Sequence, residues 1–562
     1  MIRRLPALAP ILAIALVGLL APYIARAHHT TAQAHDMPHS GAAAPASVPL
    51  FSDLGSYHHA IKTRSPMAQK YFNQGLRLLY AFNHDESIAA FEEAGRRDPR
   101  CAMAPWGVAL SYGPNINLPI DPEREQAAYA AIARAQKLAV NASPMEREWI
   151  AALAKRYSER GDGDRKQLDI AYTDAMREVA HRHPADDDAQ VLFAEALMNL
   201  RPWDHWTQDG QPQPGTEEII ATLETVLARN PMHPGANHYY IHTVEASPHP
   251  ERALAAADRL RNMMPGAGHL VHMPAHIYER TGRYADGVAA NERAVLADEK
   301  YIAERNPQGV YPLMYYSHNI HFLWAGLCDL GRSEEAIRRA REVSARITPD
   351  LVAMMPMVEF VPPTRYYALA RFGKWDEMLA EPAPPAGMHY TTAMWHYARG
   401  LALAASGKLD QAAAERDSLD EIGDAVPEDL VVGINAAKPI LRVAGAVLAG
   451  DIAYRAKRWD DAIAHYEDAV KQVDALKYDE PPAWYQPPRQ YLGKVLLDAG
   501  RPADAERVYR EDLAQHPEMG WSLIGLAQAL EAEGKTAEAA DARARFEKAW
   551  AQADVKLVAS RF

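Results

Sequence analysis

The sequence predicts an all-α protein built from many short, paired helices. Apolar residues recur at helical spacing over almost the whole chain from about residue 67. Small residues return at similar offsets along these segments, and Pro (40) outnumbers Gly (32), which suits helices with abrupt ends. The 562 residues would otherwise correspond to about three or four domains, a division that a repeat architecture makes unnecessary.

Composition excludes several classes of protein. The formal net charge of −13 argues against a broad nucleic-acid surface, which needs clustered basic residues. The two cysteines, Cys101 and Cys328, are too few for a disulfide framework or a cysteine-rich zinc ribbon. The 23 histidines are the unusual feature of this composition.

Residues 1–27 have the pattern of a secretory signal peptide. Arg3 and Arg4 precede an apolar stretch at 11–21, and a small-x-small sequence ends at Ala27. The apolar stretch is short for a membrane span, so we expect cleavage near Ala27 rather than an uncleaved anchor. The expectation is therefore an exported, periplasmic protein that is not held in the membrane after cleavage.

A polar, histidine-rich tail follows at residues 28–50. Its composition of small and polar residues predicts disorder. Short histidine-rich tracts often bind metal, and an inert tether is the equally weighted alternative.

The helical part of the chain has a recurring skeleton of small and aromatic residues. In segment 68–101, Gly75 falls in a first helix, Phe91 falls in a second, and Pro99 stops that second helix. A small residue at a helix crossing allows close packing. The same skeleton returns with Gly450 and Tyr466, and with Gly493 and Tyr509.

This skeleton resembles the tetratricopeptide repeat (TPR), a helix–turn–helix unit of about 34 residues. The resemblance covers roughly residues 67–550 and implies a TPR-type helical-hairpin solenoid, a right-handed superhelix of about eight to ten units. Units near 102–190 and 355–390 fit poorly, so irregular repeats are expected there. The family's architecture implies that the first helices line a concave groove for a partner protein or small molecule. We expect one solenoid over 51–562, closed by a capping helix within 541–562.

The same resemblance extends to exported bacterial TPR proteins of unassigned function, through GHLVHMPAHIYERTGRY at 268–284. It transfers no residue roles to this chain.

Three consecutive units at about 232–345 carry histidines in their first helices. The spacing repeats: His238 to His272 and His242 to His276 are each 34 residues apart, one repeat length. Residues four apart share a helix face, so each first helix presents a stripe of imidazoles. The candidate metal ligands are His238, His242, His269, His272, His276, His318 and His321.

Two carboxylates, Glu245 and Glu279, end the first two stripes and are the candidate catalytic residues. Each would serve as a general base to a metal-bound water or as a partner that orients an imidazole. Pro274 interrupts the second stripe, so either the helix kinks there or His269 and His272 lie in a loop.

Paired helices in register favour a metal site over two alternatives, a hydrogen-bonded ladder of neutral histidines and an anion site of protonated ones. Imidazole suits copper, zinc and iron, and the absence of a CxxCH motif argues against c-type haem. Neighbouring methionines and the predicted export favour copper, with zinc and iron as alternatives. The sequence thus predicts a metal-dependent oxidoreductase or small-molecule binder, with a metal carrier and a metal-free interaction scaffold as the other hypotheses.

Overall fold

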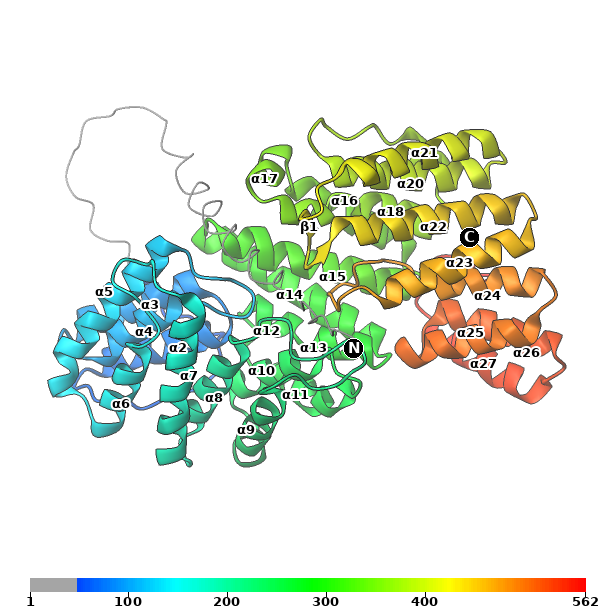
Figure 1. Cartoon of the computed structure of the whole chain (residues 1–562). Helices are drawn as coiled ribbons and strands as arrows, with labels where there is room; N and C mark the ends of the chain where they lie inside the picture. Colours follow the sequence, from blue (N-terminus) through cyan, green and yellow to red (C-terminus); the bar gives the residue numbers. More distant parts are fainter. Residues whose placement is uncertain (1–47) are drawn as a thin grey trace, which may run out of the picture. The chain divides into compact units, whose positions relative to one another are not determined.

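The computed structural model describes residues 48–562, and the predicted signal peptide and most of the histidine-rich tail lie outside this range. The chain forms two compact units (Figure 1). The first unit comprises residues up to His205 together with Pro214–Ala236, and the second comprises Trp206–Gln213 with Asn237–Phe562. None of the described helices is both long and apolar enough to cross a membrane.

The first unit consists of successive helix pairs. Its helices are α2 (Pro66–Tyr80), α3 (His84–Arg97), α4 (Met103–Ser111), α5 (Pro122–Leu138), α6 (Pro144–Leu153), α7 (Arg165–Arg182), α8 (Asp187–Met198) and α9 (Thr216–Arg229). Polar N-caps begin several of them: Ser65, Asp121, Ser143, Asp164 and Asp186 each accept a hydrogen bond from the first turn.

The second unit continues the same pattern. Its helices are α10 (Pro234–Val244, beginning at the unit boundary), α11 (Leu254–Leu260), α12 (Gly268–His272), α13 (Pro274–Arg280), α14 (Tyr284–Arg305), α15 (Tyr316–Asp329), α16 (Ser333–Arg346), α17 (Pro349–Met354), α18 (Thr364–Arg371), α19 (Trp375–Ala380), α20 (His389–Ala405), α21 (Leu409–Ala425), α22 (Ala437–Arg455), α23 (Trp459–Asp474), α24 (Pro488–Asp498), α25 (Pro502–Gln515), α26 (Gly520–Ala532) and α27 (Thr536–Ala549). A two-residue hairpin, β1 (Val431–Val432) with β2 (Asn435–Ala436), precedes α22.

The small residues of the repeat skeleton lie where helices cross, as predicted. A Cβ added at Gly75 would be 2.8 Å from the Phe91 ring, and one at Gly450 would be 2.7 Å from the Tyr466 ring. Both rings are completely buried. An all-α array of TPR-like helical hairpins is therefore confirmed.

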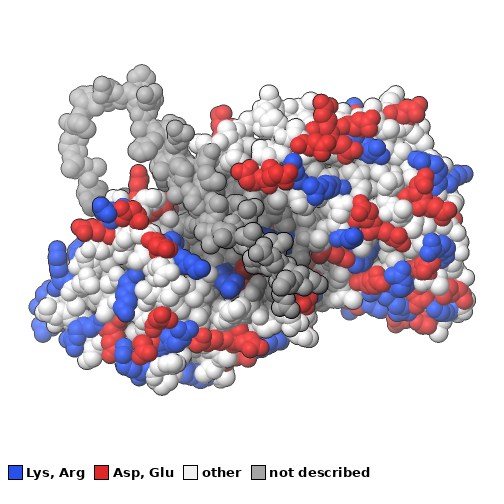
Figure 2. Space-filling view, viewed as in Figure 1, with Lys and Arg blue, Asp and Glu red and all other residues white. Residues whose placement is uncertain are grey.

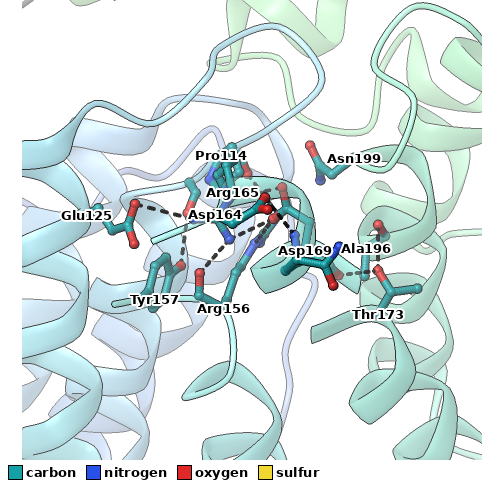
Figure 3. Close-up of polar contacts among 12 residues, drawn as sticks. Pro114, Glu125, Arg156, Tyr157, Asp164, Arg165, Asp169, Thr173, Ala196 and Asn199 are labelled. Atoms are coloured by element: carbon teal, nitrogen blue, oxygen red, sulfur yellow. Dashed lines mark hydrogen bonds and ion pairs between the residues drawn. The ribbon is translucent and has the colours of Figure 1, made fainter. Parts of the chain in front are cut away.

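A buried polar network replaces this small-residue packing in the irregular part of the first unit (Figure 3). The Arg156 guanidinium donates to the Pro114 carbonyl and to Glu195 Oε1, both at 3.2 Å, and stacks over the Tyr172 ring. Burial lowers the pKa of Arg156, but Glu195 outweighs that effect and raises it overall, so the guanidinium stays charged. This network explains why the repeat signal is weak at 102–190 although the helices still pair.

The C-terminal segment differs from the expected capping helix. Helix α27 ends at Ala549, and residues 550–562 pack irregularly onto earlier helices of the second unit. Asp554 accepts hydrogen bonds from the backbone N–H of Ser333 (2.8 Å) and of Glu334 (3.0 Å), and so caps α16 from a distant part of the chain. Arg561 forms a buried ion pair with Asp451.

Candidate metal centre

Six of the seven predicted histidines meet inside the second unit. They come from four helices: His238 and His242 from α10, His269 and His272 from α12, His276 from α13, and His318 from α15. His318 is half-buried and the others are buried. The repeat register therefore brings together side chains that are up to 80 residues apart.

The six imidazoles fall into two groups of three with ligand atoms within 4.8 Å of one another. The first histidine group is His238, His242 and His269, with ring centroids 4.9, 4.9 and 6.0 Å apart. The second histidine group is His272, His276 and His318, with centroids 4.6, 4.7 and 5.8 Å apart. Three imidazoles on one tetrahedral ion would place their centroids roughly 5 Å apart, given bonds of about 2.0–2.1 Å.

One pair of nitrogens in each group lies within hydrogen-bond distance. The Nε2 atoms of His238 and His269 are 3.1 Å apart, and those of His272 and His276 are 2.7 Å apart. Burial, together with neighbouring imidazoles, holds the pKa of His269, His272 and His318 well below the usual value. Neutral imidazole is the form that binds a metal.

Pro274 divides the second stripe into two helices. Met273 keeps helical backbone angles between α12 and α13, so His269 and His272 lie on a helix and not in a loop. His269 joins the first histidine group, while His272 and His276, which lie on either side of the break, join the second.

Two buried groups orient these imidazoles. Asn291 Oδ1 lies 2.6 Å from His272 Nδ1, and the Asn291 amide nitrogen donates to the Gly287 carbonyl at 3.2 Å. His272 Nδ1 therefore carries the proton, and its Nε2 faces His276. Glu245 Oε1 lies 3.0 Å from His242 Nδ1 and fixes that ring in the same way.

Glu245 occupies the junction between the two histidine groups. Its Oε1 contacts His242, and its Oε2 lies 2.8 Å from His276 Nδ1. Burial raises the pKa of Glu245, but His242 and His276 outweigh burial and hold that pKa well below its usual range. The contact with His242 is that of an ionised carboxylate that positions an imidazole.

Glu480 is a further carboxylate beside the histidine groups, and the sequence analysis did not find it. Its Oε2 contacts His276 Nδ1, and both side chains are buried. It lies in the loop between α23 and α24, about two hundred residues after His276 and outside the repeat register. No spacing signal connects the two positions.

His321 and Glu279 lie apart from these groups. The His321 Nε2 is 3.1 Å from Thr364 Oγ1, and its ring stacks on Trp324 with centroids 5.1 Å apart. Glu279 is half-buried, and burial together with Asp329 raises its pKa to about 8. His318 lies against His272, with ring centroids 4.7 Å apart, whereas His321, about 60° further around the axis of α15, packs against Trp324 and Thr364.

The first unit contains another set of histidine and carboxylate side chains, His59, Asp186 and Asp188. Both Asp188 oxygens already accept hydrogen bonds there, from Tyr57 and His59 on one side and from Tyr80 and His233 on the other. A carboxylate with four donors is satisfied without an ion, so this set stabilises the fold.

No protein-family model and no curated protein sequence matches this chain. Among solved structures, a human IFIT1 dimer with m7Gppp-AAAA is 12% identical, with a TM-score of 0.32 over 87% of this chain and 91% of that chain. The APC/C hetero-tetramer Cut9–Hcn1 is also 12% identical, with a TM-score of 0.28 over 86% and 94% of the two chains. Similarities this low carry no argument about function.

The description of the fold therefore rests on the chain's own helices. They pair consecutively, and their glycines lie under aromatic rings at the helix crossings. The described residues thus form an all-α array of TPR-like helical hairpins.

Proposed function

We propose that this protein binds metal at the two histidine groups of the second unit. The observation that carries the proposal is the arrangement of six imidazoles in two sets of three, each with the ring spacing of ligands around one ion. The lowered pKa of His272, caused by burial and the neighbouring imidazoles, and the orienting contacts of Asn291 and Glu245 support it.

Copper is the proposed ion, with zinc and iron as alternatives. Imidazole donors suit all three ions. The neighbouring methionines and the signal-like sequence at 1–27, which supports a periplasmic location, favour copper. With copper or iron the centre would supply one-electron chemistry, which makes an oxidoreductase the proposed activity. A carrier that loads metal through the histidine-rich tail is the alternative use of the same site.

The second candidate function is a partner-binding scaffold, which the TPR-like fold supports by itself. Positive and negative side chains are interspersed on the face of each unit shown in Figure 2. Such a surface offers many polar contacts to a partner protein.

Elemental analysis of the full chain tests the proposal. The protein is purified without chelators or metal-affinity columns, beside a His272→Ala/His276→Ala variant and a His249→Ala/His465→Ala control. His249 is exposed and His465 half-exposed, and both lie outside the two groups. We expect one or more ions per chain, lost in the first variant and kept in the control. A folded wild-type chain that stays metal-free after soaking in copper, zinc and iron salts would leave the scaffold function.

A further inference from the structure

We propose that His276 Nδ1, Glu245 Oε2 and Glu480 Oε2 form a separate metal position for a divalent ion that accepts oxygen ligands, such as Zn²⁺, Mn²⁺ or Fe²⁺. The inference rests on the proposed function and deepens it, since His276 also belongs to the second histidine group. A neutral imidazole has one lone pair, so an ion on His276 Nδ1 and an ion on its Nε2 occupy this ring alternately. It adds a carboxylate-containing position to a centre otherwise made of imidazoles, and it assigns a role to Glu480.

The positions of the protons on two rings lead to this site. Asn291 fixes the proton of His272 on Nδ1, because the amide nitrogen of Asn291 is already donating to Gly287. The bare Nε2 of His272 must then accept from His276 Nε2, 2.7 Å away. A neutral His276 with its proton on Nε2 has a lone pair on Nδ1.

That lone pair points at two carboxylates. His276 Nδ1 lies 2.8 Å from Glu245 Oε2 and also contacts Glu480 Oε2. None of these three atoms has a contact with hydrogen-bond geometry, and all are buried. Three buried acceptors that face one another repel unless a cation lies between them.

The second unit holds Glu480 in this place through its neighbours in the loop. The Asp479 carboxylate accepts from the Ile434 backbone N–H at 3.3 Å, and the Lys477 N–H donates to Asn435 Oδ1 at 2.8 Å. The Tyr478 ring lies under the Arg280 guanidinium, 5.2 Å from ring centroid to carbon. Anchors in the β1–β2 turn, on β2 and on α13 thus hold the loop that carries the Glu480 carboxylate at the buried centre.

The donor set defines the class of ion. One imidazole and two carboxylates suit zinc, iron(II) and manganese(II), whereas copper(I) prefers sulfur and nitrogen donors. A single proton shared between Glu480 and His276 is the other occupant that would relieve the repulsion, and the experiment distinguishes it from an ion.

The test measures Mn²⁺ and Zn²⁺ binding by the metal-stripped full chain. Electron paramagnetic resonance follows the loss of the free Mn²⁺ signal, and calorimetry follows Zn²⁺. The variants are Glu480→Gln, which keeps the side-chain shape, and Glu480→Ala. Tyr478→Phe is the matched control in the same loop, and circular dichroism confirms folding of each variant.

We expect wild type and Tyr478→Phe to bind Mn²⁺, and Glu480→Gln to bind it at least ~10-fold more weakly, since even indirect ligand partners contribute that much. A His238→Ala/His269→Ala variant, which changes only the first histidine group, should keep the Mn²⁺ position. Equal Mn²⁺ and Zn²⁺ binding by Glu480→Gln and wild type would overturn the Glu480 position. If only the His272→Ala/His276→Ala variant lost metal binding, the proposed function would remain intact. No binding of Mn²⁺ or Zn²⁺ by wild type would reject the Glu480 position and leave the shared proton, whereas the proposed function is rejected only if the chain also stays free of copper and iron.

Discussion

Replacing Asp188 with asparagine should destabilise the first unit by about 3–5 kcal/mol. The carboxylate of this α8 residue is almost fully buried, with 4% of its side chain exposed. It accepts from Tyr57 (2.8 Å) and His59 (2.7 Å) on one oxygen, and from Tyr80 (2.5 Å) and His233 (3.2 Å) on the other.

The magnitude follows from these four hydrogen bonds. A carboxamide keeps one acceptor oxygen and turns an N–H₂ group toward the other two donors. Two hydrogen bonds to a charged group are lost, each contributing about 1.5–3 kcal/mol. Rotation of a tyrosine hydroxyl can recover part of this loss, which brings the destabilisation toward the lower end of the range of about 3–5 kcal/mol.

The loss should depend on pH. Burial raises the pKa of Asp188, but hydrogen bonds from His233 and His59 outweigh it and hold that pKa well below its usual value. This contribution is present above the unfolded pKa of about 4 and lost as pH falls. Burial lowers the pKa of His59, but Asp188 outweighs it and raises that pKa overall. The contribution of His59 to stability is complete below about pH 6.5, and it is lost as the pH rises through the pKa of His59 in the folded protein.

Urea denaturation at several pH values, followed by hydrogen exchange of the α8 amides, measures the effect. Asp187→Asn is the matched control, because the neighbouring carboxylate is partly exposed in its contact with Arg229 and should cost no more than about 1 kcal/mol. The difference between wild type and Asp188→Asn should be largest between about pH 4 and 6.5. Equal losses in the two variants, or a loss that does not change with pH, would refute the reasoning.

Three further outcomes are expected. Gly493→Ala should lower the melting temperature and cost about 1–3 kcal/mol, because its Cβ would lie 2.3 Å from the buried Tyr509 ring. Gly423→Ala is the control: its nearest neighbour is 3.8 Å away, and it should be neutral or slightly stabilising. Asp554→Ala should remove the cap of α16 and cost about 1 kcal/mol, seen as faster hydrogen exchange at the start of that helix. Chelation should lower the melting temperature of the metal-loaded chain and re-addition should restore it, whereas unchanged melting would contradict metal binding in the folded state.

Much of the centre could be predicted because its members are related by local spacing. His238 and His242 share a helix face, and a repeat of 34 residues places His272 and His276 on the equivalent helices of the next unit. The third helix was predicted less well. His318 joins the second histidine group, but His321 turns toward Trp324 and Thr364, since one side of α15 faces α12 and α13 while another packs against α18.

The sequence by itself determined the all-α class, the pairing of helices and the meeting of the histidines, because helix periodicity and repeat length are local properties of the chain. Only the tertiary structure decided that Glu480 reaches His276, that Glu279 lies beside Asp329 and that the C-terminal segment caps α16 instead of forming a helix. These contacts join segments that no repeat spacing relates. They depend on the summed rotations of the intervening helix pairs, which small differences in packing at each pair determine.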